Sequence, residues 1–215
     1  MADSAQAAAI LARALDYPYA TPDRSYLYRD GEAVELPPEG PDLRGRTPLL
    51  SYGANASPEA LGRKLARLPG VELPVLRFEL EGFDVVYSAH VSPYGAVPAT
   101  LLEIPGAVAP VFLLHLTAEQ LALLTASEPN YDLVEVGGTP AYRSKHGCLK
   151  IDGAPVALAA VRSAGRTLPE LDEPAILERV RSHLRPELSL QEFVLDCVER
   201  GGLRPLRIGA GPAGR

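Results

Sequence analysis

The stretch LLSYGANASPEALGRKL, residues 49–65, carries the clearest structural signals in the chain. Its apolar start predicts a short strand over residues 49–52. A helix is then expected to begin at residues 57–59, Ser-Pro-Glu, and to run to about Leu68. Serine can cap a helix, proline suits the first helical position, and an acidic residue favours the positive end of the helix dipole. A tight glycine-containing turn therefore joins the predicted strand to the predicted helix.

This turn, Gly53-Ala54-Asn55, is a candidate binding element. A glycine turn between a strand and a helix exposes backbone N–H groups, which together attract a carboxylate or an oxyanion. Gly53 would let a ligand approach the backbone closely. Asn55 tolerates left-handed geometry and offers a side-chain amide. A plain turn would use the same residues, so the turn alone does not define a site.

Outward from this stretch, the sequence predicts an α+β fold. A helix capped by Ser4 precedes the stretch, and another should run from Thr117, in a capping box with Gln120, to near Glu128, since Pro129 disfavours helical geometry before it. Further helices should follow Pro174 and Ser189, the second with a capping box formed by Ser189 and Glu192. Strands are expected at residues 75–87, 99–103, 108–116 and 131–136, with hairpins around residues 30–31 and 152–153. These strands do not alternate regularly with crossover helices, which favours α+β over a doubly wound sheet.

Proline and glycine divide the chain into three predicted regions. Residues 36–42, LPPEGPD, are expected to form a linker. We therefore predict an N-terminal helix and irregular arm over residues 1–47, a central domain over residues 48–165, and a C-terminal helical extension over residues 166–215. The last seven residues, 209–215, are predicted to be a loose tail.

Composition and charge argue against several classes of function. The formal net charge is −6 and no basic run is present, which disfavours nucleic acid binding. No apolar run is long enough to span a bilayer, and the N-terminus does not have the pattern of a secretory signal. Two cysteines make neither a disulfide framework nor a metal site, and the four histidines are scattered. We expect a cytoplasmic protein without a metal, a cofactor or a membrane partner.

Glu128 is the candidate residue for proton transfer. It lies at the end of an apolar helix, in LLTASEPNY, and a carboxylate beside several leucines is expected to be partly desolvated. Such a carboxyl group suits proton transfer near neutral pH. The alternative is a solvated glutamate at a helix end. Two other pairs, Ser88 with His90 and His146 with Cys148, follow from alternation along a strand and are weak candidates for a nucleophile and base.

When the turn and the glutamate are considered together, the chain resembles the gamma-glutamylcyclotransferase family. The resemblance covers about residues 48–161. Tyr52-Gly53-Ala54-Asn55 is similar to the family's Tyr-Gly-Ser-Asn loop, and residues 95–106, GAVPATLLEIPG, are similar to its glycine and Pro-Gly strand pattern. Residues 108–116 match the strand that follows. The helix LTAEQLALLTASE is similar to the one whose end supplies the family's catalytic glutamate, here Glu128. The resemblance implies a small mixed β-barrel flanked by helices, here with extra N- and C-terminal helices.

The reaction that the resemblance implies is the release of 5-oxoproline from a gamma-glutamyl amine or peptide. The substrate's own α-amine attacks its γ-carbonyl, so the enzyme must fold the substrate and move protons. Glu128 would be the general acid and base. The implied substrate contacts are Tyr52, Gly53, Ala54, Asn55 and Tyr131. The expected partner is this small molecule, with no metal, cofactor or nucleic acid.

Three departures from the family pattern keep other functions open. Ala54 replaces the usual serine, Thr125 stands where an aspartate is common, and Pro129 follows Glu128 where glycine is frequent. A non-catalytic small-molecule-binding or interaction module on the same fold therefore remains an alternative, as does an acyl or amine transferase that acts on a different amide. The oligomeric state is not predicted by any of these patterns.

Overall fold

The computed structural model describes residues 4–208 and shows an α+β protein in that part of the chain. Its five α-helices and mixed nine-stranded sheet confirm the predicted class. The helices are α1 (Ser4–Leu15), α2 (Pro58–Leu65), α3 (Ala118–Ala126), α4 (Glu173–Leu184) and α5 (Leu190–Glu199), with a 3₁₀ turn, η1 (Ala54–Ala56). The strands are β1 (Tyr26–Arg29), β2 (Glu32–Val34), β3 (Thr47–Ser51), β4 (Glu72–Tyr87), β5 (Ala99–Leu116), β6 (Tyr131–Val136), β7 (Thr139–Ser144), β8 (Lys150–Ile151), β9 (Ala154–Pro155), β10 (Ala157–Leu158) and β11 (Glu170–Leu171). The predicted tail at 209–215 lies outside the described residues.

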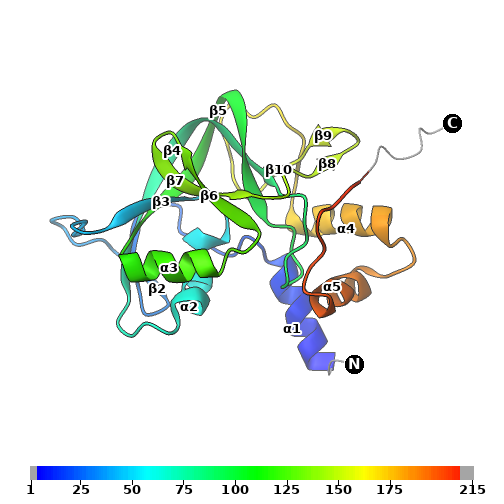
Figure 1. The fold of residues 1–215 in the computed structure, drawn as a ribbon, viewed down its shortest axis with the longest axis horizontal. Helices are drawn as coiled ribbons and strands as arrows, with labels where there is room; N and C mark the ends of the chain where they lie inside the picture. The colour runs from blue at the N-terminus through cyan, green and yellow to red at the C-terminus, as the bar shows by residue number, and fades with distance from the viewer. Residues whose placement is uncertain (1–3, 209–215) are drawn as a thin grey trace.

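Two long antiparallel strands, β4 and β5, form the centre of the sheet (Figure 1). The main strand order is β11-β10-β4-β5-β3-β7-β6, with the β1–β2 hairpin attached to β4, while β8 and β9 form a separate hairpin. β3 runs parallel to β7 and antiparallel to β5. Among the described residues the pairings run from β11 to β6 without closing into a ring. The closed barrel that the family resemblance implies is therefore not made by these pairings.

β5 corrects the prediction of two separate strands at 99–103 and 108–116. The strand runs continuously through Pro105 and Gly106, opposite an irregularity in the register between Glu81 and Phe83 of β4. Pro105 and Gly106 are exposed, and Gly106 has φ +84°. A proline that cannot donate to the ladder is tolerated at such a bulge, so it bends the strand without ending it.

Most predicted starts and turns are confirmed, with three local corrections. The capping boxes Thr117/Gln120 and Ser189/Glu192 both form, and the hairpins at residues 30–31 and 152–153 are present. The helix predicted to reach Leu68 ends at Leu65. The Ser57 hydroxyl makes no capping hydrogen bond. Strand β7, which pairs with β6 across a Gly-Gly turn, was not predicted because its sequence TPAYRS lacks a clear apolar alternation.

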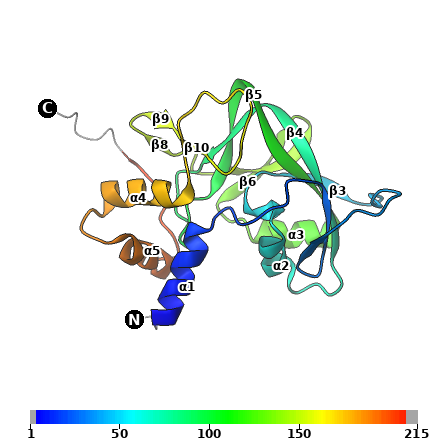
Figure 2. The same cartoon turned by 180° about the vertical axis from the view of Figure 1, so that it is seen from behind.

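The helices form two groups on different sides of the sheet (Figures 1 and 2). α2 lies with α3, whereas α1, α4 and α5 pack on one another. The N-terminal region also joins the sheet, since β1 pairs with β4. The predicted division into three regions remains a prediction. None of the helices between residues 4 and 208 is long and apolar enough to cross a bilayer.

Candidate functional site

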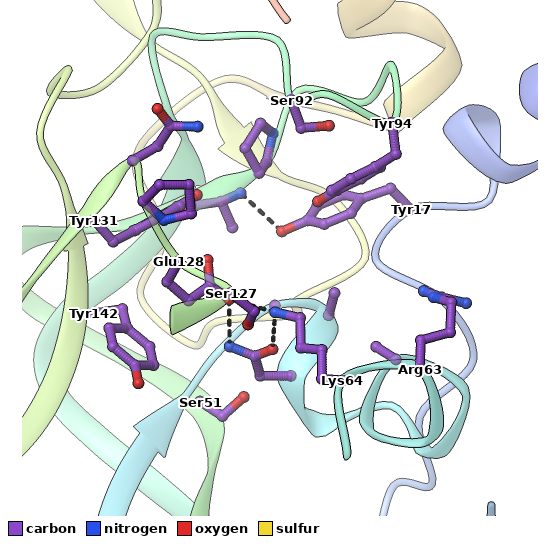
Figure 3. Close-up of a pocket in the computed structure, with 18 of the residues that line it drawn as sticks. Tyr17, Ser51, Arg63, Lys64, Ser92, Tyr94, Ser127, Glu128, Tyr131 and Tyr142 are labelled. Carbon is purple, nitrogen blue, oxygen red and sulfur yellow. Dashed lines mark hydrogen bonds and ion pairs between the residues drawn. The ribbon is translucent and has the colours of Figure 1, made fainter. Parts of the chain in front are cut away.

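A cavity of about 630 Å³ opens where several parts of the chain meet (Figure 3). They include the turn after β3, helix α2, the loop between β4 and β5, the end of α3, and the segment that follows α1. All six residues predicted for the site contribute to its wall: Tyr52, Gly53, Ala54, Asn55, Glu128 and Tyr131. The structure thus brings together two stretches that are 73 residues apart in sequence, at Asn55 and Glu128.

Glu128 and the turn are in direct contact. The Asn55 side-chain amide donates a hydrogen bond from Nδ2 to Oε1 of Glu128 at 2.9 Å. The end of α3 fixes the position of the glutamate, because the Ser127 and Glu128 N–H groups bond back to carbonyl groups of its last turn. Glu128 thus leaves the helix at a defined point and faces the turn.

Lys64 is a site residue that the sequence interpretation missed. Its ammonium group contacts Oε1 of Glu128 and donates to Oδ1 of Asn55 at 2.6 Å (Figure 3). The Lys64 side chain is 22% exposed and that of Glu128 14%, so the pair is largely shielded from water. Glu128 therefore lies in a polar cluster, and the expected surrounding of leucines is wrong as a description of its carboxylate.

A periodic signal for Lys64 is present in the sequence. Ala66 lines the cavity, and the other lining residues of α2 and its C-terminal end are Ala60, Arg63, Lys64 and Arg67. Their spacing of i, i+3, i+4 and i+7 places them on one helix face. Three of these four residues are basic, and a basic stripe on the helix after a candidate anion-binding turn could have been read as part of the same site.

The turn at residues 53–55 exposes the backbone donors that its sequence predicted. Its own hydrogen bonds use the N–H groups of Ala56 and Ser57, at 3.2 and 2.9 Å. Within residues 4–208, the N–H groups of Gly53, Ala54 and Asn55 have no hydrogen-bond acceptor. All three residues line the cavity, and an unpaired backbone N–H can bind a ligand oxygen.

Three of the cavity's tyrosine hydroxyl groups, those of Tyr52, Tyr131 and Tyr142, are hydrogen-bonded within the protein. Tyr52 donates to the Tyr142 carbonyl, and Tyr131 donates to the Ala99 carbonyl at 2.9 Å. The hydroxyl groups of Tyr142 and Thr125 are 2.8 Å apart. Burial raises the pKa of both Tyr52 and Tyr131, so both stay neutral. Their rings shape the cavity, and their hydroxyl groups stabilise its walls.

The segment after α1 supplies side chains that lie outside the family resemblance. Tyr17 and Tyr19 line the cavity beside Tyr94. The Arg13 guanidinium lies 5.1 Å from the centre of the Tyr94 ring, and that of Arg63 lies 4.6 Å from the Tyr19 ring. These cation–π contacts connect the N-terminal segment with α2 and with the loop before β5.

The charge of the cavity is opposite to that of the whole chain. Four basic side chains line it, Arg13, Arg63, Lys64 and Arg67, and among the described residues Glu128 is its one carboxylate. The chain as a whole has a formal charge of −6. This concentration of cations favours a ligand that carries at least one anionic group.

The two other candidate pairs take part in structure. The Ser88 hydroxyl is 2.7 Å from Nδ1 of His90 and 2.6 Å from the Ser144 hydroxyl, but Ser88 is fully buried and does not line the cavity. Burial, with His146 and Arg204 nearby, lowers the pKa of His90 to about 3. No hydrogen bond joins His146 to Cys148 in the described part of the chain. His90 itself lines the cavity, whereas Ser88 lies behind it, and His146 and Cys148 are partly exposed.

The described residues contain no group of three or more His, Cys, Asp or Glu side chains placed to hold a metal ion.

Comparisons with known proteins gave no match: no family model, no curated protein and no solved structure matches the chain. The family resemblance therefore rests on the motifs quoted above, and function must be argued from the cavity.

Proposed function

We propose that this protein is a gamma-glutamylcyclotransferase-like enzyme that releases 5-oxoproline from a gamma-glutamyl amine or peptide. One observation carries the proposal. An acid/base candidate, Glu128, and three free backbone donors at residues 53–55 share one cavity, joined by the hydrogen bond from Asn55 to Glu128 at 2.9 Å. The reaction needs a base for an amine and donors for an oxyanion, and this cavity provides both within reach of one small molecule.

In the proposed reaction, the ionised Glu128 accepts a proton from the substrate α-ammonium group. The free amine attacks the γ-carbonyl carbon, and the new C–N bond closes a five-membered ring. Glu128 returns this proton to the leaving nitrogen and takes a second proton from the ring nitrogen as the bond from the carbon to the leaving nitrogen breaks. The released amine then takes up the second proton from Glu128. The products are 5-oxoproline and the free amine, and no outside reactant is needed. Because the attack is intramolecular, the protein mainly has to hold the folded substrate.

The surrounding groups suit these steps. Lys64 and Asn55 hold the Glu128 carboxylate in place. The free N–H groups at residues 53–55 would hold the substrate carboxylate or the developing oxyanion. A fixed donor of this kind contributes about 3 kcal/mol to transition-state stabilisation.

The departures from the family pattern are compatible with this chemistry. At position 54 the backbone N–H is the group that the proposal uses, so a serine hydroxyl is not required. The Thr125 hydroxyl lies 2.8 Å from that of Tyr142, and so Thr125 supports a residue of the cavity wall. We also propose that the bent sheet around β4 and β5 corresponds to the barrel-like arrangement of the family. We further propose that the protein is located in the cytoplasm.

A panel of gamma-glutamyl amides and peptides tests the proposal through the release of 5-oxoproline. We expect turnover by the wild-type chain and its loss in Glu128→Gln, which keeps the size of the side chain but cannot carry the proton. Glu135→Gln is the matched control, because Glu135 is exposed on β6 and does not line the cavity. Absence of turnover with every member of the panel, or full activity in Glu128→Gln, would contradict the proposal.

A second candidate is a small-molecule-binding module without turnover. The observation in its favour is the ion pair of Glu128 with Lys64, since a paired carboxylate also suits a purely structural role. This candidate predicts that a gamma-glutamyl compound binds at residues 53–55 and is recovered unchanged. Binding with no product after long incubation would favour it over the enzyme.

A further inference from the structure

Tyr17 places a hydroxyl group beside the candidate anion-binding turn, although it belongs to the N-terminal segment outside the family resemblance. Its hydroxyl oxygen accepts a hydrogen bond from the Ala99 N–H at 2.8 Å. The same oxygen lies so close to Gly53 that a Cβ atom there would be 2.6 Å from it. Tyr17 is 6% exposed and lines the cavity (Figure 3). The close approach that Gly53 permits is thus made by Tyr17.

Hydrogen-bond accounting separates Tyr17 from Tyr52 and Tyr131, while the Tyr19 hydroxyl has no partner within residues 4–208. A tyrosine hydroxyl can donate one hydrogen and can also accept. Tyr52 and Tyr131 donate theirs to backbone carbonyl groups. Tyr17 acts as an acceptor toward Ala99, and no acceptor within residues 4–208 takes its hydrogen. A buried donor is normally satisfied, so this hydrogen is available for a group that enters the cavity.

We propose that Tyr17 is a further ligand-binding residue, which donates its hydroxyl hydrogen to an oxygen atom of the molecule bound beside residues 53–55. This proposal deepens the proposed function and rests on it for the identity of the ligand. In the cyclisation, Tyr17 would add a neutral donor to the three backbone N–H groups that face the substrate carboxylate or the developing oxyanion. The hydrogen bond from Ala99 fixes the oxygen, so the donor is oriented before the ligand arrives.

The neutral state of Tyr17 fits this role. Burial raises the pKa of Tyr17 well above its ordinary value, the nearby Tyr94 adds to the rise, and the hydrogen bond from Ala99 opposes it. The hydroxyl group therefore keeps its hydrogen throughout the neutral pH range. A donor that never ionises there can stabilise negative charge on a ligand without itself repelling it.

Tyr17→Phe is the test variant, because it removes the hydroxyl and keeps the ring. Tyr87→Phe is the matched control: Tyr87 is fully buried, its hydroxyl donates to the Leu171 carbonyl at 3.0 Å, and it does not line the cavity. Both variants are compared with the wild type for 5-oxoproline release, for equilibrium binding of L-glutamine, and for thermal stability. L-Glutamine carries the α-amine, α-carboxylate and γ-amide of the proposed substrate.

We expect Tyr17→Phe to lower kcat/KM by up to about a hundredfold, or to weaken L-glutamine binding at least tenfold, whereas Tyr87→Phe changes stability alone. Wild-type turnover with Tyr17→Phe no more impaired than the control would overturn the role of Tyr17 and leave the proposed function standing. Absence of turnover, together with L-glutamine binding that depends on Tyr17, would support Tyr17 and reject the cyclotransferase. If the wild-type chain neither turns over substrate nor binds L-glutamine, both proposals fall.

Discussion

The contact between Gly53 and Tyr17 allows a quantitative test of how the site is packed. In the Gly53→Ala variant, the added Cβ would lie 2.6 Å from the Tyr17 hydroxyl oxygen, which is closer than carbon and oxygen can pack. The hydroxyl cannot simply turn aside, because the Ala99 N–H holds it at 2.8 Å. Either the Tyr17 side chain or the turn must therefore move.

The magnitude follows from ordinary packing energies. Overpacking in a tight site costs about 1–3 kcal/mol, so we expect Gly53→Ala to lower the free energy of unfolding by that amount. In a Tyr17→Phe background the close oxygen is gone, and the next atoms are Ala99 Cβ at 3.5 Å and Tyr17 Cζ at 3.7 Å. These are normal contacts. In that background Gly53→Ala should change stability by less than about 1 kcal/mol, in either direction.

Urea unfolding of the wild type, the two single variants and the double variant gives the coupling energy directly. We expect a coupling of about 1–3 kcal/mol, with the alanine tolerated only when the tyrosine hydroxyl is absent. The slope of the unfolding transition serves as the internal control, because an unchanged slope shows that the same surface unfolds in all four proteins. Equal destabilisation by Gly53→Ala in both backgrounds would refute the described contact.

Two further predictions concern groups away from the turn. Arg166→Met should lower the free energy of unfolding by about 3–5 kcal/mol, because Arg166 pairs at 2.8 Å with the fully buried Asp84. The control is Arg29→Met, which breaks the half-exposed pair with Glu72 and should cost less than about 1 kcal/mol. Similar losses of stability for the two variants in urea unfolding would contradict the prediction. Burial lowers the pKa of His90 from its ordinary value of 6.5 to about 3, so its contribution to stability is complete above pH 6.5 and falls by up to about 1.4 kcal/mol per pH unit as the pH is lowered toward 3. The pH profile of urea unfolding should lose this part of its slope in His90→Asn, and an unchanged slope would contradict the assignment.

Local signals in the sequence were enough to predict the class of fold and several helix starts and turns. The capping boxes at Thr117 and Ser189 and the turn pair at residues 30–31 depend on neighbours in sequence, so each can be read without tertiary information. Pro105 misled the prediction, because a proline in sequence looks like the end of a strand. Its tolerance in β5 depends on the facing irregularity in β4, which is a property of the pair.

The same distinction applies to the site. Glu128 and residues 53–55 could be selected from the sequence because each stands at the end of a predicted element. Lys64 and Tyr17 could not be selected in this way, since their roles depend on contacts across the cavity: Lys64 with Glu128, and Tyr17 with Ala99. The predicted setting of Glu128 failed for this reason, because the leucines are its neighbours in sequence whereas its carboxylate meets Lys64 and Asn55 in space.

The most direct test of the central claim is the identity of the product formed in water enriched in ¹⁸O. The wild-type chain is incubated with a gamma-glutamyl amide, and the released acid is identified by mass spectrometry. Because the attacking atom is the substrate's own nitrogen, we predict 5-oxoproline without ¹⁸O, released together with one equivalent of amine, and its disappearance in Glu128→Gln. Glutamate carrying ¹⁸O would show that water attacks instead, and would contradict the proposed cyclisation in this cavity.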